Sequence, residues 1–485
     1  MVIALYTSRV VLNTLGVVDY GVNNVVGSFI GLFSFLTNSL SSSMQRYYNF
    51  EGSKDGNIGF SNVLSAGIKI HLVVSLIVTF IFETAGIWYV NNVAVIPTGR
   101  IVAANFLFQV VVVSSVLSIM SSPFSGIILA KEHMNFAAFV GIGDVILRLL
   151  LVILLPYIPF DKLVAYSIIT LLVTIVNVLS NVAYIKFKFP EIRIIWNHTG
   201  TLQNNILSFT GWNMAGTFAM MLKGQGINML LNFFFGPIVN AARGIAYQVN
   251  TSLSNFYYNV AIAFRPQIVN SYASEDYERT KYLMFLESRI CFALIMILIT
   301  PMIIEMPYVL SIWLGNIVPE HTIAFASLIL IETLVYTLHT PCSQVVLAVG
   351  RIRNFQIVNT VVNLGLLPTS WICLMLGYRA EMVFVINIVF AIINTIWCLC
   401  YTNTIFRFGL IPYFKRVILP CLALALCTPI VPYILTLIMP FGFIRLLVVF
   451  ITSSFILIIG TYYILLNRNE RSFLLNFLLK NSKKY

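Results

Sequence analysis

Fourteen apolar runs follow one another along this chain, and most of them are long enough to cross a membrane. A helix of about 20 apolar residues spans the hydrocarbon layer, which is about 30 Å thick. Charged residues make up only 9% of the chain, whereas soluble domains carry about 25%. The long unbroken runs exclude a membrane β-barrel, because barrel strands are short and alternate in polarity. The sequence therefore predicts an all-α integral membrane protein.

The runs predict about fourteen transmembrane helices. They cover residues 1–15, 22–45, 62–90, 100–129, 134–158, 162–187, 203–234, 239–264, 281–314, 321–348, 355–377, 381–406, 413–437 and 441–466. The first run makes only about 22 Å of helix, which indicates that Met1 is a late start within helix 1. Pro301 and Pro307 predict a kink in the ninth run.

The distribution of lysine and arginine orients the chain. Loops after even-numbered runs, together with the C-terminal tail, hold 19 of the 29 lysines and arginines. Loops after odd-numbered runs hold four, namely Arg100, Lys162, Arg379 and Arg445. The positive-inside rule then places the first set, and both termini, in the cytoplasm. This loop bias explains the net charge of +12, so no nucleic-acid partner is predicted.

Two pairs of segments indicate an internal duplication. PFSGIILA at 123–130 and PCSQVVLA at 341–348 share the pattern P-x-S-x-x-x-L-A. LNTLGVVDYG at 12–21 resembles LNFFFGPIVNA at 231–241, which matches Gly16 with Gly236 at nearly the same offset along the chain. The acidic loops EGSKDG and YASEDYE follow at similar distances. A duplication of six helices predicts two parallel repeats with a site between them.

The predicted organisation has five parts. They are an N-lobe at 1–187 with helices 1–6, a basic cytoplasmic linker at 188–202, a C-lobe at 203–406 with helices 7–12, helices 13–14 at 407–467, and a basic cytoplasmic tail at 468–485.

Six cations lie inside the apolar runs: Arg9, Lys69, Arg148, Lys223, Arg243 and Arg289. A charge at the bilayer centre is costly, so such side chains usually face a protein interior or a wet cavity. Cations near a membrane face can instead extend to it, which is the alternative for Lys69, Arg243 and Arg289. Arg148 follows Asp144 by one helical turn, so a purely structural pair is its alternative.

Arg9 and Lys223 have no acidic neighbour one turn away on their own helices, which makes them the leading candidates for ligand contact. Lys223 begins the stretch KGQGIN, whose two glycines permit a helix break or a close helix approach. A cationic cavity favours an anionic cargo, and arginine binds phosphate well.

Five acids lie within the runs: Glu83, Asp144, Glu287, Glu305 and Glu332. Glu83 and Glu305 can reach an interface. Asp144 and Glu332 are the candidates for coupling to H⁺ or Na⁺, with a relay from Glu332 to His339 as one hypothesis. No Walker motif, H-E-x-x-H or C-x-x-C is present, so we expect no enzyme, no metal site and no other cofactor. The seven cysteines are predicted to be packing residues.

LYTSRVVLNTLG at 5–16, GQGINMLLNFFFGPIVNAARGIAYQVN at 224–250 and RPQIVNSYAS at 265–274 resemble bacterial polysaccharide flippases. These are the O-antigen (Wzx-like) members of the multidrug/oligosaccharidyl-lipid/polysaccharide (MOP) exporter superfamily. The resemblance implies two six-helix lobes in a V around a cationic cavity. It also implies alternating access that moves an undecaprenyl-diphosphate-linked oligosaccharide from the cytoplasmic to the periplasmic leaflet.

Carried onto this chain, the resemblance implies that Arg9, Lys223 and Arg243 lie near the diphosphate. It further implies the bacterial inner membrane, a role in O-antigen, lipopolysaccharide or capsule synthesis, and polymerase and assembly proteins as partners. Three alternatives stay open: a cation-coupled drug exporter of the same superfamily, a membrane scaffold for glycan enzymes, and a carrier of another lipid-linked polymer. Because helix 1 carries an arginine and no acid, its charge weighs against the drug exporter.

Overall fold

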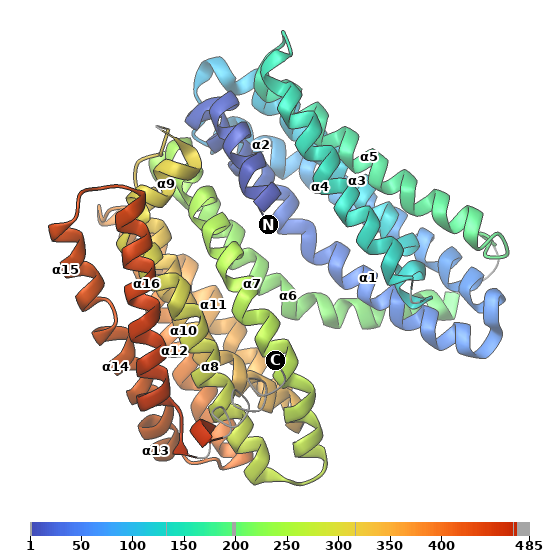
Figure 1. Ribbon diagram of the computed structural model, residues 1–485. Helices are drawn as coiled ribbons and strands as arrows, with labels where there is room; N and C mark the ends of the chain where they lie inside the picture. Colours follow the sequence, from blue (N-terminus) through green and yellow to red (C-terminus); the bar gives the residue numbers. More distant parts are fainter. Residues whose placement is uncertain (1, 132, 196–199, 316, 469, 473–485) are drawn as a thin grey trace, which may run out of the picture. The chain divides into compact units, whose positions relative to one another are not determined.

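The computed structural model describes residues 2–131, 133–195, 200–315, 317–468 and 470–472. These residues form helices and connecting turns and contain no strand (Figure 1). Ten of the described helical segments are long and apolar enough to cross a membrane. They coincide with the third to sixth and the ninth to fourteenth predicted runs. The prediction of an all-α membrane protein is therefore confirmed.

The first three predicted runs form one long helical element, α1 (Val2–Ile81), which Gly16 and Gly56 divide. Both glycines have positive φ, 77° and 58°, a conformation that glycine adopts without the steric cost of a Cβ. The element continues through η1 (Phe82–Gly86) and α2 (Ile87–Asn92). The rest of this half comprises η2 (Thr98–Arg100), α3 (Ile101–Ala130), α4 (Met134–Leu154), η3 (Leu155–Tyr157) and α5 (Lys162–Lys188).

The second half begins with two long helices, and its remaining predicted runs each form one or more helices. In order they are α6 (Gly200–Phe235), α7 (Pro237–Ala273), α8 (Tyr277–Ile304), α9 (Met306–Leu314), α10 (Thr322–Val349), α11 (Ile352–Met375) and α12 (Glu381–Phe406). The chain ends with α13 (Leu410–Tyr413), η4 (Phe414–Ile418), α14 (Leu419–Cys427), α15 (Ile430–Ile438), α16 (Phe443–Gly460) and η5 (Thr461–Leu465). The predicted kink lies at Glu305, where α8 ends and α9 begins.

The backbone supports the duplication at positions that the sequence matched. Gly16 and Gly236 both have φ of 77°, and each separates the first helix of its half from the second. Gly56 at φ 58° corresponds to Glu275 at φ 61°, and each breaks the helix before the third span. Both pairs lie at nearly the same offset along the chain. Two segments that share side chains and left-handed breaks at one offset are what a duplication produces.

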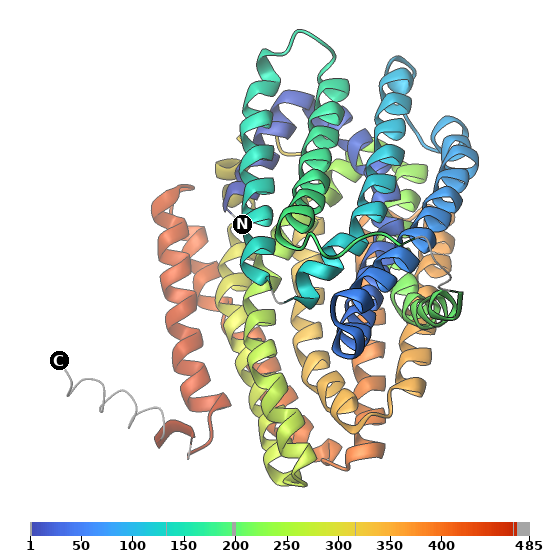
Figure 2. The same cartoon turned by 90° about the vertical axis from the view of Figure 1, so that its right-hand side faces the viewer.

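Contacts divide the chain into two compact units. Unit 1 comprises residues 1–244, 316–320 and 363–380, and unit 2 comprises residues 245–315, 321–362 and 381–485. In unit 1, α1 packs against α3, α4, α5 and α6, and Figures 1 and 2 show α4 and α5 side by side. Unit 1 therefore places residues of the predicted first lobe in contact with α6.

Residues 193–195 of the predicted linker lie along α1. The backbone N–H of Arg193 donates to Ser61 Oγ at 3.1 Å, and that of Ile195 donates to Ser65 Oγ at 2.7 Å. These bonds satisfy backbone donors that no helix would otherwise satisfy. The boundaries of the predicted lobes, linker and tail stay predictions.

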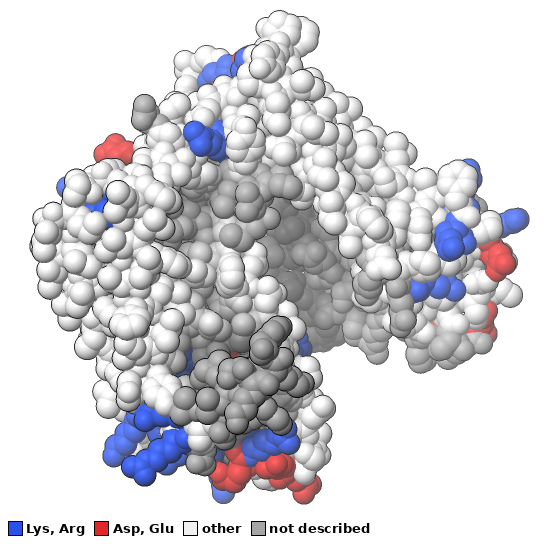
Figure 3. All heavy atoms as spheres, in the orientation of Figure 1, with Lys and Arg blue, Asp and Glu red and all other residues white. Residues whose placement is uncertain are grey.

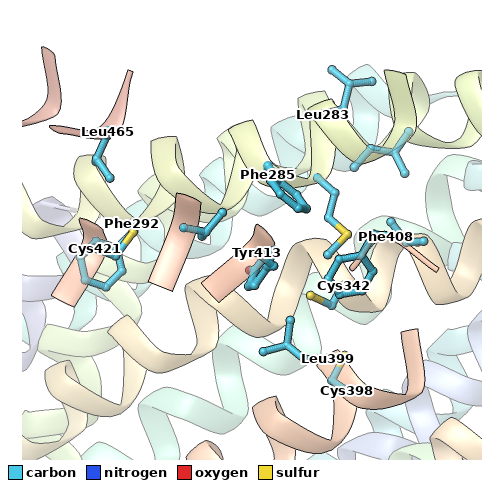
Figure 4. Packing of buried hydrophobic residues seen from close by; sticks show 14 of the residues in the cluster. Leu283, Phe285, Phe292, Cys342, Cys398, Leu399, Phe408, Tyr413, Cys421 and Leu465 are labelled. Atoms are coloured by element: carbon cyan, nitrogen blue, oxygen red, sulfur yellow. The ribbon is translucent and has the colours of Figure 1, made fainter. Parts of the chain in front are cut away.

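The core of unit 2 lies among α8, α10, α12 and the helices after Phe406 (Figure 4). Phe285 packs edge-on against Tyr413, whose hydroxyl lies 2.9 Å from Ser288 Oγ. Cys342 and Cys398 are fully buried in this core, as expected of packing residues. Cys400 and Cys427 are exposed instead, on helix faces that point away from the core.

Two buried ion pairs join the last helices to the α8 region. Arg445 of α16 pairs with Glu305 at 2.8 Å, and Glu305 has no exposed surface. Arg289 pairs with Glu470 at 2.7 Å, and its side chain is 3% exposed. Both charges are therefore neutralised inside the protein, and the hypotheses that Glu305 and Arg289 reach a membrane face stay predictions. In Figure 2, α16, drawn in red, lies alongside α8.

Candidate functional site

Unit 1 contains a polar cavity of about 330 Å³ among four helices. Among its described lining residues, the two charged ones are Asp144 and Arg148 of α4. Hydroxyl and amide side chains form most of the remaining wall: Thr37, Ser41, Ser118, Ser121, Ser122, Ser125, Thr174, Asn177 and Asn181. A cavity of this size and polarity inside a membrane protein can hold several waters or hydrated ions.

The two charged groups of this cavity belong to one small network. Asn177 Nδ2 donates to Asp144 Oδ1 at 2.5 Å, and Arg148 Nη2 lies 3.8 Å from Asp144 Oδ2. Arg148 also hydrogen-bonds Tyr166 of α5. The side chains of Arg148 and Asp144 are 40% and 25% exposed, so the ion pair is open to the cavity. A long, half-exposed pair of this kind contributes little stability and leaves both charges available to a ligand.

A similar hydrogen bond, here called a clamp, joins two helices of the second half, but both of its side chains are uncharged. Asn394 Nδ2 of α12 donates to Asn359 Oδ1 of α11 at 2.7 Å. Asn359 and Asn394 follow Asp144 and Asn177 at close to the offset of the duplication. An amide therefore suffices to join this helix pair, and the carboxylate of Asp144 is an addition confined to the first half.

A second polar network joins α1, α6 and α7. Arg243 is 8% exposed, and its Nη2 donates to the backbone carbonyl of Gly224 at 2.6 Å. Arg243 therefore lies against the residue next to Lys223. Asn240 Nδ2 donates to Asn228 O and Oδ1 at 2.7 Å, and Asn228 Nδ2 donates to Asn24 O at 2.9 Å.

Glycines allow these helices to approach closely. A Cβ placed on Gly21 would lie 1.9 Å from the carbonyl oxygen of Pro237. A Cβ on Gly244 would lie 2.6 Å from Asn24 Nδ2. Because both distances are far below van der Waals contact, only glycine fits at either position without movement of its neighbour. Asn232 of α6 accepts from the backbone N–H of Val95, in the segment after α2, at 2.9 Å.

An apolar cavity of about 390 Å³ lies along α6, with walls from α2 and α11. Its residues on α6 include Gly226, Leu230 and Phe233, which recur at helical spacing on one face. Trp371 stacks on Phe233 with a centroid distance of 5.3 Å. Lys223 precedes Gly226 by about one helical turn, so it continues the same face.

The other predicted site residues lie at separate places. Arg9 and Lys69 are half-buried in different parts of α1. Glu332 of α10 is 8% exposed and accepts from Asn387 Nδ2 of α12 at 2.7 Å. His339 stacks on Phe355. The assignment of these residues to a ligand or a relay stays a prediction.

A cluster of three charges joins the loops predicted to lie outside the cytoplasm. Arg100 Nη2 donates to Asp19 Oδ2 and its Nη1 donates to Asp161 Oδ2, each at 2.5 Å. The hydrogen bond from Arg100 lowers the pKa of Asp161 below 3.8. For the less exposed Asp19, burial outweighs the same arginine and raises the pKa. Asp161 also caps α5 by accepting from Leu163 N.

Sequence reasoning missed several polar partners. Glu287 accepts from Gln344 Nε2 at 2.9 Å, and Gln344 belongs to the repeated motif PCSQVVLA. Ser125 of the matching motif lines the polar cavity. The recurrence of the motif was therefore a usable signal for polar helix contacts. The partners Asn177 and Glu470 gave no such signal, because they are far from Asp144 and Arg289 in sequence.

No family model matches the sequence, and no curated protein matches it. Solved structures do match its fold. An inward-facing multidrug resistance MATE family transporter of the MOP superfamily superposes with a TM-score of 0.72 at 15% identity, over 84% of this chain and 96% of that one. The lipid II flippase MurJ, in an inward closed conformation, gives a TM-score of 0.69 at 12% identity, over 95% of this chain and 96% of MurJ. The chain has the fold of the MATE and MurJ transporters.

This shared fold agrees with the ten apolar helices of the described residues, which indicate a multi-pass membrane protein. A MATE transporter of the MOP superfamily in an outward-facing conformation superposes less closely, with a TM-score of 0.53 at 13% identity, over 83% of this chain and 96% of that one. Two of these three matched structures are MATE transporters and the third is a flippase.

Proposed function

We propose that this chain is a flippase for undecaprenyl-diphosphate-linked oligosaccharides. It would move the repeat unit from the cytoplasmic to the periplasmic leaflet by alternating access, as a step in O-antigen, lipopolysaccharide or capsule synthesis. Its place would be the bacterial inner membrane, with both termini in the cytoplasm. Its cargo would come from glycan assembly proteins and pass to a polymerase.

The observation that carries this proposal is the extent of the match to the lipid II flippase. A match over 95% of the chain can omit only a short part of it, so it must include most of residues 407–485, which follow α12. The MATE match over 84% leaves room to omit them. The flippase likeness therefore extends to the helices that lie beyond the duplication, which Arg445 and Arg289 join to the rest of unit 2.

Intramembrane cations supply the chemistry for a diphosphate. We assign Arg9, Lys69, Arg148, Lys223 and Arg243 to this role, and the contact of Arg243 with Gly224 supports a shared position for the last two. The apolar cavity that begins one turn from Lys223 fits part of an isoprenoid chain. A cation beside an apolar cavity matches a ligand with a charged head and a long apolar tail.

Asp144 and Glu332 are the proposed sites of ion coupling. Asp144 faces a polar cavity, and the matched position in the second half carries the uncharged Asn359. A carboxylate that the helix contact does not need is a reasonable place for a proton or Na⁺. Glu332 is more deeply buried, with Asn387 as its partner.

Alternating access requires a contact that opens. The close approach of Gly21 to Pro237, with the bonds among Asn24, Asn228 and Asn240, joins helices of the first predicted repeat to those of the second. We propose that this contact closes the outer side. These bonds are hydrogen bonds of amide side chains and include no ion pair. The helices can therefore separate here without pulling opposite charges apart.

The test uses the native host with the gene deleted. The deletion is complemented with wild type, Arg9→Ala or Arg9→Lys, and undecaprenyl-diphosphate-linked oligosaccharides are quantified by leaflet. We expect cytoplasmic accumulation in the deletion, correction by wild type, partial correction by Arg9→Lys and none by a stably expressed Arg9→Ala. Normal sidedness in the deletion, in a strain without a second flippase gene, would refute the proposal.

A second candidate is cation-coupled multidrug efflux, which the TM-score of 0.72 to a MATE transporter favours. The two functions are separated in the same deletion strain by measuring resistance to cationic dyes and drugs. A drug-sensitive deletion with normal glycan sidedness, restored by wild type but not by Asp144→Asn, would decide for efflux.

A further inference from the structure

A second polar cavity, of about 190 Å³, lies in unit 2 at the first turns of α8. Three cations from two segments line it: Lys281 and Arg289 of α8, and Arg416 of η4. Tyr282 and Asn467 add hydrogen-bonding groups, and Glu278 is the carboxylate among the described lining residues. Charged side chains of both signs gather at this end of unit 2 (Figure 3).

The three cations are held to different degrees. Arg289 is fixed, because it pairs with Glu470 at 2.7 Å and also donates to the carbonyl of Leu465. Lys281 is half-buried and Arg416 is exposed. Neither has a hydrogen-bond or ion-pair partner among the residues that the structure describes. With Arg289 neutralised by Glu470, these two charges still exceed the single charge of Glu278, so the cavity attracts an anion.

The surroundings of the cavity identify the kind of anion. Next to Arg416 along the chain, Phe414 and Leu419 are 51% and 53% exposed. Large apolar side chains exposed on a membrane protein face lipid chains, so the cavity borders the bilayer. The predicted orientation places this end of α8 at the cytoplasmic face, where anionic lipids collect beside basic residues. A phosphate attached to acyl chains fits this combination better than a free phosphate.

We propose that this cavity binds the phosphate headgroup of an anionic phospholipid of the cytoplasmic leaflet. Lys281 and Arg416 bind the phosphate, Asn467 donates a hydrogen bond to the headgroup, and the acyl chains lie against Phe414 and Leu419. The ligand is a resident lipid and is distinct from the transported cargo. The bound lipid would bridge η4 and the start of α8 at the protein surface. The buried ion pair of Arg289 and Glu470, which joins α8 to the C-terminal segment, lies close by.

The test is native mass spectrometry of the full chain in detergent, titrated with phosphatidylglycerol or with phosphatidylcholine of the same acyl chains. Wild type is expected to prefer phosphatidylglycerol. The double variant Lys281→Gln/Arg416→Gln should bind phosphatidylglycerol about thirty-fold more weakly, from about 1 kcal/mol per cation at a membrane surface. Lys415→Gln is the matched control, because Lys415 is exposed, adjacent to Arg416 and outside the cavity.

Three results of this titration would overturn the proposal. They are no preference in wild type, an unchanged preference in the double variant, or an equal loss in Lys415→Gln, which would indicate diffuse surface charge. A fourth arm adds inorganic phosphate in excess. Displacement of the lipid by phosphate at millimolar concentration would show a site for free phosphate and refute the lipid assignment. The charge-preserving Arg416→Lys should bind as wild type does, which separates loss of charge from loss of fold.

Discussion

Replacing Gly21 by alanine tests the contact that we propose as the outer closure. The new Cβ would lie 1.9 Å from the carbonyl oxygen of Pro237 and 2.5 Å from its carbonyl carbon. Non-bonded carbon and oxygen rarely approach within about 3 Å, so α1 and α7 would have to separate by about 1 Å. A backbone atom cannot move aside as a flexible side chain can, and overpacking of this kind costs about 1–3 kcal/mol.

Gly27→Ala is the matched control on the same helix. A Cβ at Gly27 meets nothing within 4 Å. Alanine is favoured over glycine in a helix by about 1 kcal/mol, so this control is expected to be neutral or stabilising. The two variants add the same methyl group to one element, and only the neighbour differs. Because the helix-propensity gain is common to both variants, Gly21→Ala should be less stable than Gly27→Ala by the overpacking cost of about 1–3 kcal/mol.

The assay has a global and a local readout. Thermal unfolding in detergent reports the free energy of unfolding, and hydrogen exchange followed by mass spectrometry reports opening of segments 17–31 and 237–244. We expect Gly21→Ala to lower stability and to speed exchange in both segments, with little change in unit 2. Equal stability and exchange in the two variants would mean that α1 and α7 are not in close contact at Gly21, and the closure would lose its basis.

Three further predictions concern polar groups. Asp161→Ala removes a helix cap and the Arg100 pair and should cost about 1 kcal/mol by thermal unfolding, whereas Asp161→Asn should keep most of the cap. The folded pKa of Asp161 is below 3.8, so its contribution to the free energy of unfolding is present above about pH 4 and is lost as the pH falls through the folded pKa. Unfolding of wild type and the two variants, measured against pH, checks this. Glu305→Gln leaves Arg445 without its carboxylate and should cost about 3 kcal/mol. Asn228→Ala should cost about 1–3 kcal/mol in unfolding, because the carbonyl of Asn24 loses its donor and Asn240 keeps only the backbone carbonyl of residue 228.

Most of the fold could be predicted from the sequence because hydropathy and proline report on a local property. The runs at 162–187 and 381–406 end within a residue of α5 and α12. The kink between Pro301 and Pro307 was predictable for the same reason. By contrast, nothing local fixed the helix breaks inside α1 at Gly16 and Gly56, because glycine permits both a turn and a helix.

The partners of charged residues were much harder to predict. The spacing of Asp144 and Arg148 on one helix revealed their pair, since four residues make one turn. Arg289 and Glu470 are 181 residues apart, and only the packing of the last helices against α8 brings them together. The position of a charged residue along a predicted membrane helix therefore indicates how costly its burial is. The residue that pairs with that charge depends on tertiary structure.

The two halves of the chain together give the sharpest test of ion coupling. Asn177 donates to Asp144 in the first half as Asn394 donates to Asn359 in the second, so Asp144→Asn should reproduce the clamp that the protein already uses. Its stability should stay within about 1 kcal/mol of wild type, because Arg148 is half-exposed to a polar cavity and needs no buried partner. Asn359→Ala removes a clamp and should cost about 1–3 kcal/mol. If the carboxylate couples transport to H⁺ or Na⁺, Asp144→Asn should leave a folded protein whose transport no longer varies with pH or sodium. A variant that unfolds as readily as Asp144→Ala would instead make the carboxylate structural, and the coupling role would then fall to Glu332 alone.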